Sequence, residues 1–119
     1  MTDTPRASGA RQADQIAWQR QATAVLADLL ARAADENLPV LTWRIGAAGI
    51  DIVGRSVAYP TAGRRDDITA WARALGIKLR ERTGTDKTTI TGTARQQATR
   101  HGFATITLTC DIYPYNSGE

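Results

Sequence analysis

The chain is poor in cysteine and histidine: Cys110 and His101 are the only ones among 119 residues. A single cysteine excludes an internal disulfide, and one cysteine with one histidine does not complete a tetrahedral metal site. No apolar run approaches the roughly 18 residues of a membrane-spanning helix. Residues 1–15 lack the hydrophobic centre of a secretory signal. We therefore expect no metal, no cofactor, no membrane association and a cytoplasmic location.

Lysine is scarce, and arginine is not. The 15 basic residues are 13 arginines and 2 lysines, and with 12 acidic residues they give a net charge of +3. A strong nucleic-acid-binding domain usually concentrates more positive charge than this. We attribute the arginine bias first to a GC-rich coding sequence, bacterial or phage, although arginine is also the better donor to phosphates and carboxylates.

The hydrophobic pattern divides the chain into three segments. Residues 1–12 have no periodicity and are predicted to be a flexible N-terminal tail. Residues 13–113 alternate between helical and strand patterns without a repeat or a linker, which predicts a single α+β domain with one modest core. Residues 114–119 are predicted to be a C-terminal tail.

Two stretches have apolar residues at spacings of three and four, which predicts amphipathic helices. The first covers about residues 12–36. Asn37 is suited to end it in a left-handed conformation, and Pro39 prevents its continuation. The second covers about residues 66–75, with Asp66 as its N-cap and a glycine after its last turn.

Alternating apolar and polar residues predict five strands. The first two form a hairpin within residues 40–55, and the others cover residues 77–82, 87–95 and 103–113. The order along the chain is therefore α-β-β-α-β-β-β. Both helices are apolar on one side only, so the expected fold is an antiparallel sheet of about five strands with two helices packed on one face.

The last two strands carry threonine at every second position. If the apolar residues between them, such as Ile106 and Leu108, face the helices, the threonines face solvent. Threonine favours strands, and cross-strand threonine pairs contribute roughly 0.2–1 kcal/mol each. A solvated sheet face is therefore the simplest interpretation. For the threonines of both strands to lie on this one face, the numbers of residues that pair between the two strands must sum to an even number.

The same face is expected to carry most of the basic residues of the sheet. The candidate binding residues are Arg44, Arg55, Lys78, Arg80, Arg82 and Arg95. Cations held at intervals on strands can contact phosphates or the carboxylates of an acidic protein. Trp43 and Trp71 are assigned to the core, and Tyr59 and Tyr113 to strand or loop ends. The aromatic rings on which bases could stack are therefore expected to lie mostly away from this face.

The sequence predicts no catalytic residue. A general base at His101, in the turn between the last two strands, would need a pocket with an orienting carboxylate. Asp111, Asp86 and Glu81 show no recognisable spacing to it, so a solvated turn residue is the simpler interpretation. Cys110 falls on the apolar side of its strand and is predicted to be a buried small hydrophobe.

Three classes of function follow from these features. We favour a small non-catalytic regulatory or adaptor protein that binds an acidic partner through its basic Thr/Arg sheet face or an edge strand. The first alternative is a nucleic-acid-binding module that uses the same arginines on phosphates. The second is a small enzyme that uses His101. A homodimer built on the first helix or an edge strand is also open.

Overall fold

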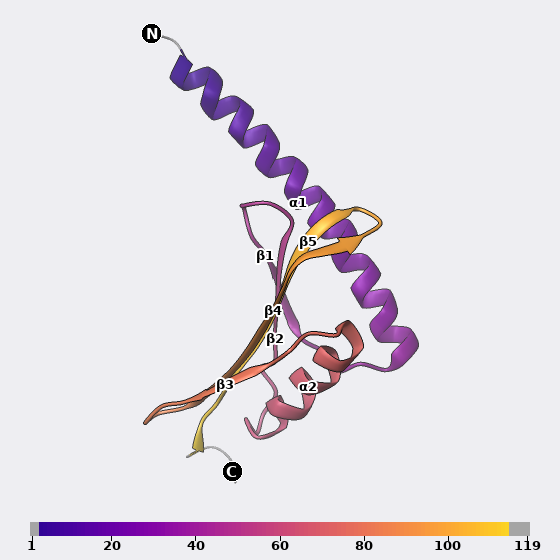
Figure 1. The fold of residues 1–119 in the computed structure, drawn as a ribbon, viewed down its shortest axis with the longest axis vertical. Helices are drawn as coiled ribbons and strands as arrows, with labels where there is room; N and C mark the ends of the chain where they lie inside the picture. Colours follow the sequence, from indigo (N-terminus) through magenta and orange to yellow (C-terminus); the bar gives the residue numbers. More distant parts are fainter. Residues whose placement is uncertain (1–2, 115–119) are drawn as a thin grey trace.

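The computed structural model describes residues 3–114, with side chains from Arg11 onward (Figure 1). The elements in chain order are α1 (Asp3–Glu36), β1 (Thr42–Ile45), β2 (Asp51–Arg55), α2 (Gly63–Leu75), β3 (Arg80–Thr83), β4 (Thr88–Thr99) and β5 (Gly102–Ile112). The five strands form one sheet, and both helices pack against the same side of it (Figure 1). The predicted α+β architecture is confirmed. None of the described helices has the length and apolarity to cross a bilayer.

The sheet is mixed, which corrects the prediction of a purely antiparallel sheet. Its strand order is β1-β2-β5-β4-β3. β2 and β5 run parallel, with Ile52 opposite Ile106, while the other neighbouring pairs are antiparallel. The chain passes through α2, β3 and β4 between these two strands, and a crossover of this length is what a parallel pair needs. Alternation along a strand shows which face is apolar but not which strand lies beside it.

The two faces of the sheet are as the alternation predicts. Ile106 is 2% exposed and Leu108 0%. Thr107 between them lies opposite Thr93 on the other face, and Thr109 lies opposite Thr91. Paired residue numbers in this part of the β4–β5 hairpin sum to an even number, so the predicted register is confirmed there.

A β-bulge between Ala94 and Gln97 changes this register further along β4. Gln96 adopts a φ of 54°, in the left-handed region. Because the bulge absorbs an extra residue, β4 bends and continues to Thr99. The sequence predicted that the strand would end at residue 95 and a turn would follow. That prediction was wrong, since an inserted residue interrupts the alternation by which strands are recognised.

Helix α1 begins at Asp3, well before the predicted start near residue 12. Pro5 falls in its first turn, where a helix tolerates proline because the missing N–H has no intrahelical acceptor. This part of α1 projects beyond the sheet (Figure 1). A projecting helix needs no apolar stripe, so hydrophobic periodicity did not indicate it. Residues 1–2 and residues 115–119, most of the predicted C-terminal tail, lie outside the described residues.

The ends of the helices agree in part with the prediction. Asn37, after α1, has the expected left-handed conformation with a φ of 55°, and so does Gly76, after α2, with a φ of 70°. Helix α2 starts at Gly63, so Asp66 lies in its first turn and is not the N-cap. Its negative charge is favourable there because the first turn carries the positive end of the helix dipole.

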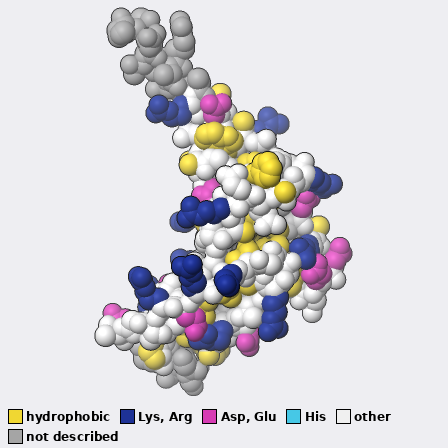
Figure 2. Space-filling model, viewed as in Figure 1, with side chains coloured by type: hydrophobic (Ala, Val, Ile, Leu, Met, Phe, Trp, Pro, Cys, Tyr) yellow, Lys and Arg dark blue, Asp and Glu magenta, His cyan; other side chains and the backbone are white. Residues whose placement is uncertain are grey.

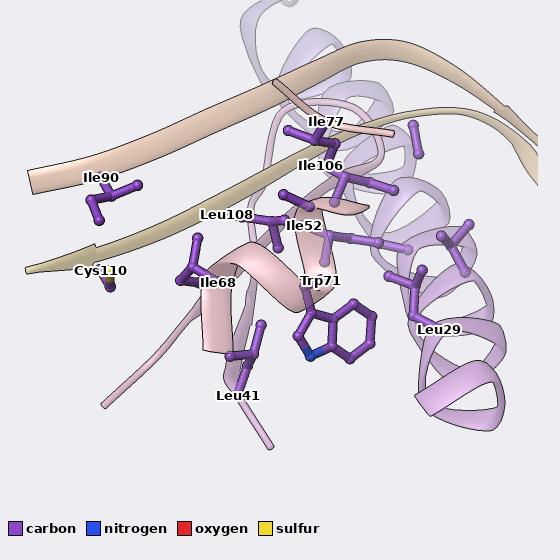
Figure 3. Packing of buried hydrophobic residues seen from close by; sticks show 14 residues of the cluster. Leu29, Leu41, Ile52, Ile68, Trp71, Ile77, Ile90, Ile106, Leu108 and Cys110 are labelled. Atoms are coloured by element: carbon purple, nitrogen blue, oxygen red, sulfur yellow. The ribbon is translucent and has the colours of Figure 1, made fainter. Parts of the chain in front are cut away.

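The core fills the space between the helices and the sheet (Figure 3). Its large buried side chains are Leu29, Leu41, Ile52, Ile68, Trp71, Ile77, Ile90, Ile106, Leu108 and Cys110. Trp71 packs edge to face on the half-buried Trp43, with ring centroids 5.1 Å apart. Its Nε1–H donates to the Pro39 carbonyl oxygen at 2.7 Å, so the indole is buried with its polar group satisfied. The assignment of both tryptophans to the core is confirmed.

Two glycines on the strands beside Leu108 let neighbouring segments pack directly on the backbone of the sheet. Leu108 of β5 lies opposite Gly54 of β2 and Gly92 of β4. A Cβ at Gly92 would lie 2.5 Å from the Lys78 carbonyl oxygen, and one at Gly54 would lie 2.6 Å from the Trp43 ring. The close approach at Gly92 brings the segment before β3 against β4. It therefore sets where Lys78 stands on the polar face.

Candidate functional site

Threonine forms the centre of the sheet face that the helices leave open. Thr93 lies opposite Thr107 and Thr91 opposite Thr109. The hydroxyls of Thr93 and Thr107 are 3.1 Å apart and share a hydrogen bond. The Thr93–Thr107 contact satisfies part of the hydrogen-bonding capacity of these two hydroxyls, and the two cross-strand pairs together build a polar floor over β4 and β5.

The structure brings four of the six predicted basic residues together along this floor. Lys78, Arg80 and Arg95 line a depression of about 350 Å³ with Thr91 and Thr93. A second depression, of about 450 Å³, continues past Arg80 to Arg82, and a third, of about 440 Å³, lies beside Arg95 and Thr107. Neighbouring depressions share Arg80 or Arg95, so the three lie side by side along β4. We call them together the cationic trough; its basic residues are Lys78, Arg80, Arg82 and Arg95.

Strand β3, at the edge of the trough, is held by a contact with α2. Arg65 of α2 forms an ion pair with Glu81 of β3, and this contact leaves Arg80 and Arg82, on either side of Glu81, on the open face. Figure 2 shows a group of basic side chains along the side of the molecule away from α2. Within residues 11–114, the side chains of the four basic residues of the trough make no hydrogen bond or ion pair.

The other two predicted basic residues, Arg44 and Arg55, stand across the sheet on β1 and β2. Three strand spacings separate Arg55 from β3, which is roughly 14 Å. Arg55 donates from Nη1 to Asp111 Oδ2 at 3.2 Å, so its charge is partly neutralised. Arg44 has no such partner in the described part of the chain. The sequence predicted all six residues on one face, and the structure separates these two from the other four.

Asp111 is a fixed negative charge at one end of the face. Thr89 Oγ1 donates to its Oδ1 at 2.9 Å, and Lys87 Nζ lies 3.5 Å from its Oδ2. Partial burial would by itself raise the pKa of Asp111, but the hydrogen bond from Thr89 and the charges of Lys87 and Arg55 together lower it. The carboxylate is therefore ionised at neutral pH.

Cys110 lies on the core side of β5 and is fully buried, as predicted. Burial, with a smaller contribution from the neighbouring charge of Asp111, raises the pKa of its thiol to about 11. Reactivity needs the thiolate, which at pH 8 would be about one molecule in a thousand even without steric protection. The side chain therefore serves as a small hydrophobe.

We expect Cys110 to resist the thiol reagent DTNB at pH 8 while the chain is folded and to react fully once urea unfolds it. The coloured product released by the reaction measures both rates. The folded protein should react at least about a hundredfold more slowly, because reaction requires opening of the core. Rapid stoichiometric reaction of the folded protein would contradict the buried position of the thiol.

His101 lies where the turn of the β4–β5 hairpin meets α1. Its Nε2 is 3.1 Å from Asp28 Oδ2. Arg100 donates to the same carboxylate, from Nε at 2.9 Å and from Nη2 at 2.7 Å. The hydrogen bond from Arg100 is the main reason that the pKa of Asp28 is lowered. The hairpin turn is thus fastened to the helix through one carboxylate.

Sequence reasoning missed Asp28 as the partner of His101. It considered Asp111, Asp86 and Glu81, which are near in sequence, whereas Asp28 lies 73 residues earlier in the chain. The only signal was a carboxylate at the border of the apolar stripe of α1, and such a residue is usually only solvated. No spacing rule connects a helix position with a distant hairpin turn.

An open notch of about 530 Å³ lies beside this contact. Its lining residues are Ala17, Arg20, Gln21, Ala24, Arg100 and His101. The notch is a shallow space between α1 and the hairpin. None of its lining side chains has a hydroxyl or a thiol that a histidine could activate as a nucleophile.

Comparison with known proteins found no significant match among protein-family models, curated proteins or solved structures. In the described residues, no three histidine, cysteine or acidic side chains are grouped as metal ligands would be. The function of the chain is therefore inferred from the chemistry of the trough and the notch.

Proposed function

We propose that this protein is a small non-catalytic regulatory or adaptor protein that binds an acidic segment of a partner protein in the cationic trough. The observation that carries the proposal is that three basic side chains meet at one depression of the sheet face. Lys78, Arg80 and Arg95 line one depression with two threonine hydroxyls, and these three cations have no ion-pair partner in the described chain. A guanidinium group offers a planar pair of donors that matches a carboxylate, and rigid strands keep the donors in place.

The geometry supports binding across the face better than strand addition at an edge. Both edge strands, β1 and β3, have only four residues. β3 places charged side chains on both of its faces, and β4 carries its bulge at Gln96 where it extends past β3. Short, charged and bulged edges are features that oppose pairing with another strand. The partner is therefore expected to lie over the threonine floor and to contact side chains.

The pattern of charge favours an acidic protein over a nucleic acid. Asp111 is ionised beside Arg55, and Asp51 lines one end of the trough. A phosphate backbone would meet like charge at both places, whereas a protein partner can place a cation opposite each. The trough also lacks an aromatic side chain for base stacking. The alternative is that the same arginines contact the phosphates of a nucleic acid, and the test below distinguishes this from binding of an acidic protein.

The test is a charge reversal with a matched control. The trough variant carries Lys78→Glu, Arg80→Glu and Arg95→Glu; the control carries Arg11→Glu, Arg32→Glu and Arg73→Glu, which change the net charge equally. Binding to labelled polyglutamate is followed by fluorescence anisotropy. We expect the trough variant to lose at least about tenfold in affinity, because the cations that meet the ligand become repulsive, and the control to lose much less.

Two results would contradict the proposal. Equal losses in both variants would show that net charge, and not the trough, attracts polyanions. Tighter binding to a DNA or RNA oligonucleotide than to polyglutamate, with affinity falling steeply as salt is added, would favour the nucleic-acid alternative. A homodimer stays a prediction, and sedimentation of the same samples measures it.

A further inference from the structure

The notch between α1 and the β4–β5 hairpin brings together nitrogen donors from two distant parts of the chain. Arg20 and Gln21 come from one turn of α1, and Arg100 and His101 come from the hairpin turn that lies against it (Figure 1). The notch shares no lining residue with the cationic trough, so it is a separate feature of the molecule.

Asp28 orients the hairpin groups but leaves part of their donor capacity free. Arg100 uses Nε and Nη2 on this carboxylate, and its Nη1 has no acceptor among the described residues. Arg20 is exposed, and its side chain makes no hydrogen bond or ion pair there either. The two arginines outweigh the single charge of Asp28, so the notch is positive at neutral pH. An arginine has five N–H donors in a fixed plane, and those not used within the protein are available to a ligand.

We propose that this notch binds a phosphoryl group, either as inorganic phosphate or as the phosphate of a small monoester. A tetrahedral oxyanion presents acceptor oxygens in several directions, so it can bridge donors that approach from a helix and from a hairpin turn. Guanidinium groups are suited to such bidentate contacts. A volume of about 530 Å³ is within the range of small-molecule sites and exceeds what one phosphate fills, which leaves room beside Ala17 and Ala24 for the organic part of an ester.

Binding at this site would join the hairpin turn to α1 more firmly. The ligand would contact groups from both elements, so it would bind the folded chain and not the unfolded one. The apparent stability would then rise with phosphate concentration by mass action. Chloride at the same ionic strength screens charge but cannot bridge the donors, which makes it the reference salt.

His101 is the only histidine of the chain, so its imidazole signal in NMR reports on the notch directly. Inorganic phosphate is titrated at fixed pH and constant ionic strength. We expect a saturable shift with a dissociation constant in the millimolar range or tighter. Arg20→Ala should weaken binding by about tenfold, which corresponds to about 1.4 kcal/mol. Arg11→Ala, an exposed arginine on the same helix that does not line the notch, is the matched control and should bind as the wild type does.

Weaker binding by the Arg20→Ala variant can be distinguished from loss of the fold. Because Arg20 is exposed, its replacement should leave the fold intact, and circular dichroism checks this. Phenyl phosphate in place of inorganic phosphate separates the two sources of the phosphoryl group: tighter binding of the ester indicates a monoester ligand, and equal binding indicates the free ion. A shift that never saturates, a shift of the same size with chloride, or equal affinity in the Arg20→Ala and wild-type proteins would overturn the proposal.

Discussion

A Leu108→Asp variant is expected to be unfolded, whereas Thr107→Asp, one residue earlier on the same strand, is expected to fold. Leu108 is 0% exposed and packs between Gly54 and Gly92 of the neighbouring strands. A carboxylate placed there loses its hydration without gaining a partner, and such burial costs several kcal/mol or forces the group to stay protonated. A domain of this size has about 5–15 kcal/mol of stability in total.

Thr107 is on the open face, so its replacement by aspartate keeps the charge in water. The variant loses the hydrogen bond between the hydroxyls of Thr107 and Thr93, and we expect a cost of about 1 kcal/mol. Far-ultraviolet circular dichroism and urea unfolding of the two variants measure the difference. If Thr107→Asp unfolded and Leu108→Asp did not, the assignment of the two sheet faces would be wrong.

Trp71→Ala is expected to lower the free energy of unfolding by about 3–5 kcal/mol, the usual cost of removing a large buried aromatic side chain. Trp71 of α2 is 1% exposed, belongs to the buried cluster (Figure 3), and is in contact with Trp43 of β1. Its indole N–H also donates to the Pro39 carbonyl oxygen, which ties α2 to the segment that follows α1. Removal creates a cavity and leaves that carbonyl without its donor.

Two further variants divide this effect into parts. Trp71→Phe keeps an aromatic ring but loses the N–H, so we expect it to cost about 1–3 kcal/mol. Trp18→Ala removes the same side chain from a half-buried position on α1 and should cost clearly less than Trp71→Ala. Urea denaturation gives all three values. A loss at Trp18 as large as the loss at Trp71 would contradict the expectation that the fully buried side chain contributes more to stability than the half-buried one.

The helices, the core side of each strand and the basic character of the open face could be predicted from the sequence because they depend on local periods. Ile106 and Leu108 face the core for the same reason that Thr107 faces solvent: adjacent side chains of a strand point to opposite faces. A helix stripe is equally local. The burial of Cys110 follows from the same alternation.

The mixed sheet, the bulge at Gln96 and the Asp28–His101 contact could not be predicted in this way. Each depends on which segments become neighbours, and an alternating pattern is compatible with several neighbours. The early start of α1 was missed for a different reason, since that part of the helix projects beyond the sheet and its sequence has no hydrophobic periodicity.

The same distinction between local pattern and tertiary contact applies to the candidate sites. Residue types and alternation were enough to place six cations on one face, because both properties belong to single strands. Strand order then separated Arg44 and Arg55 from the trough, and the close approach of Lys78 to Gly92 completed its lining. The notch depends wholly on tertiary contact, because Arg20 and Arg100 meet only when the hairpin turn packs on the helix. Local chemistry thus selects the face that a side chain occupies, and the packing of distant segments selects the side chains that it stands beside.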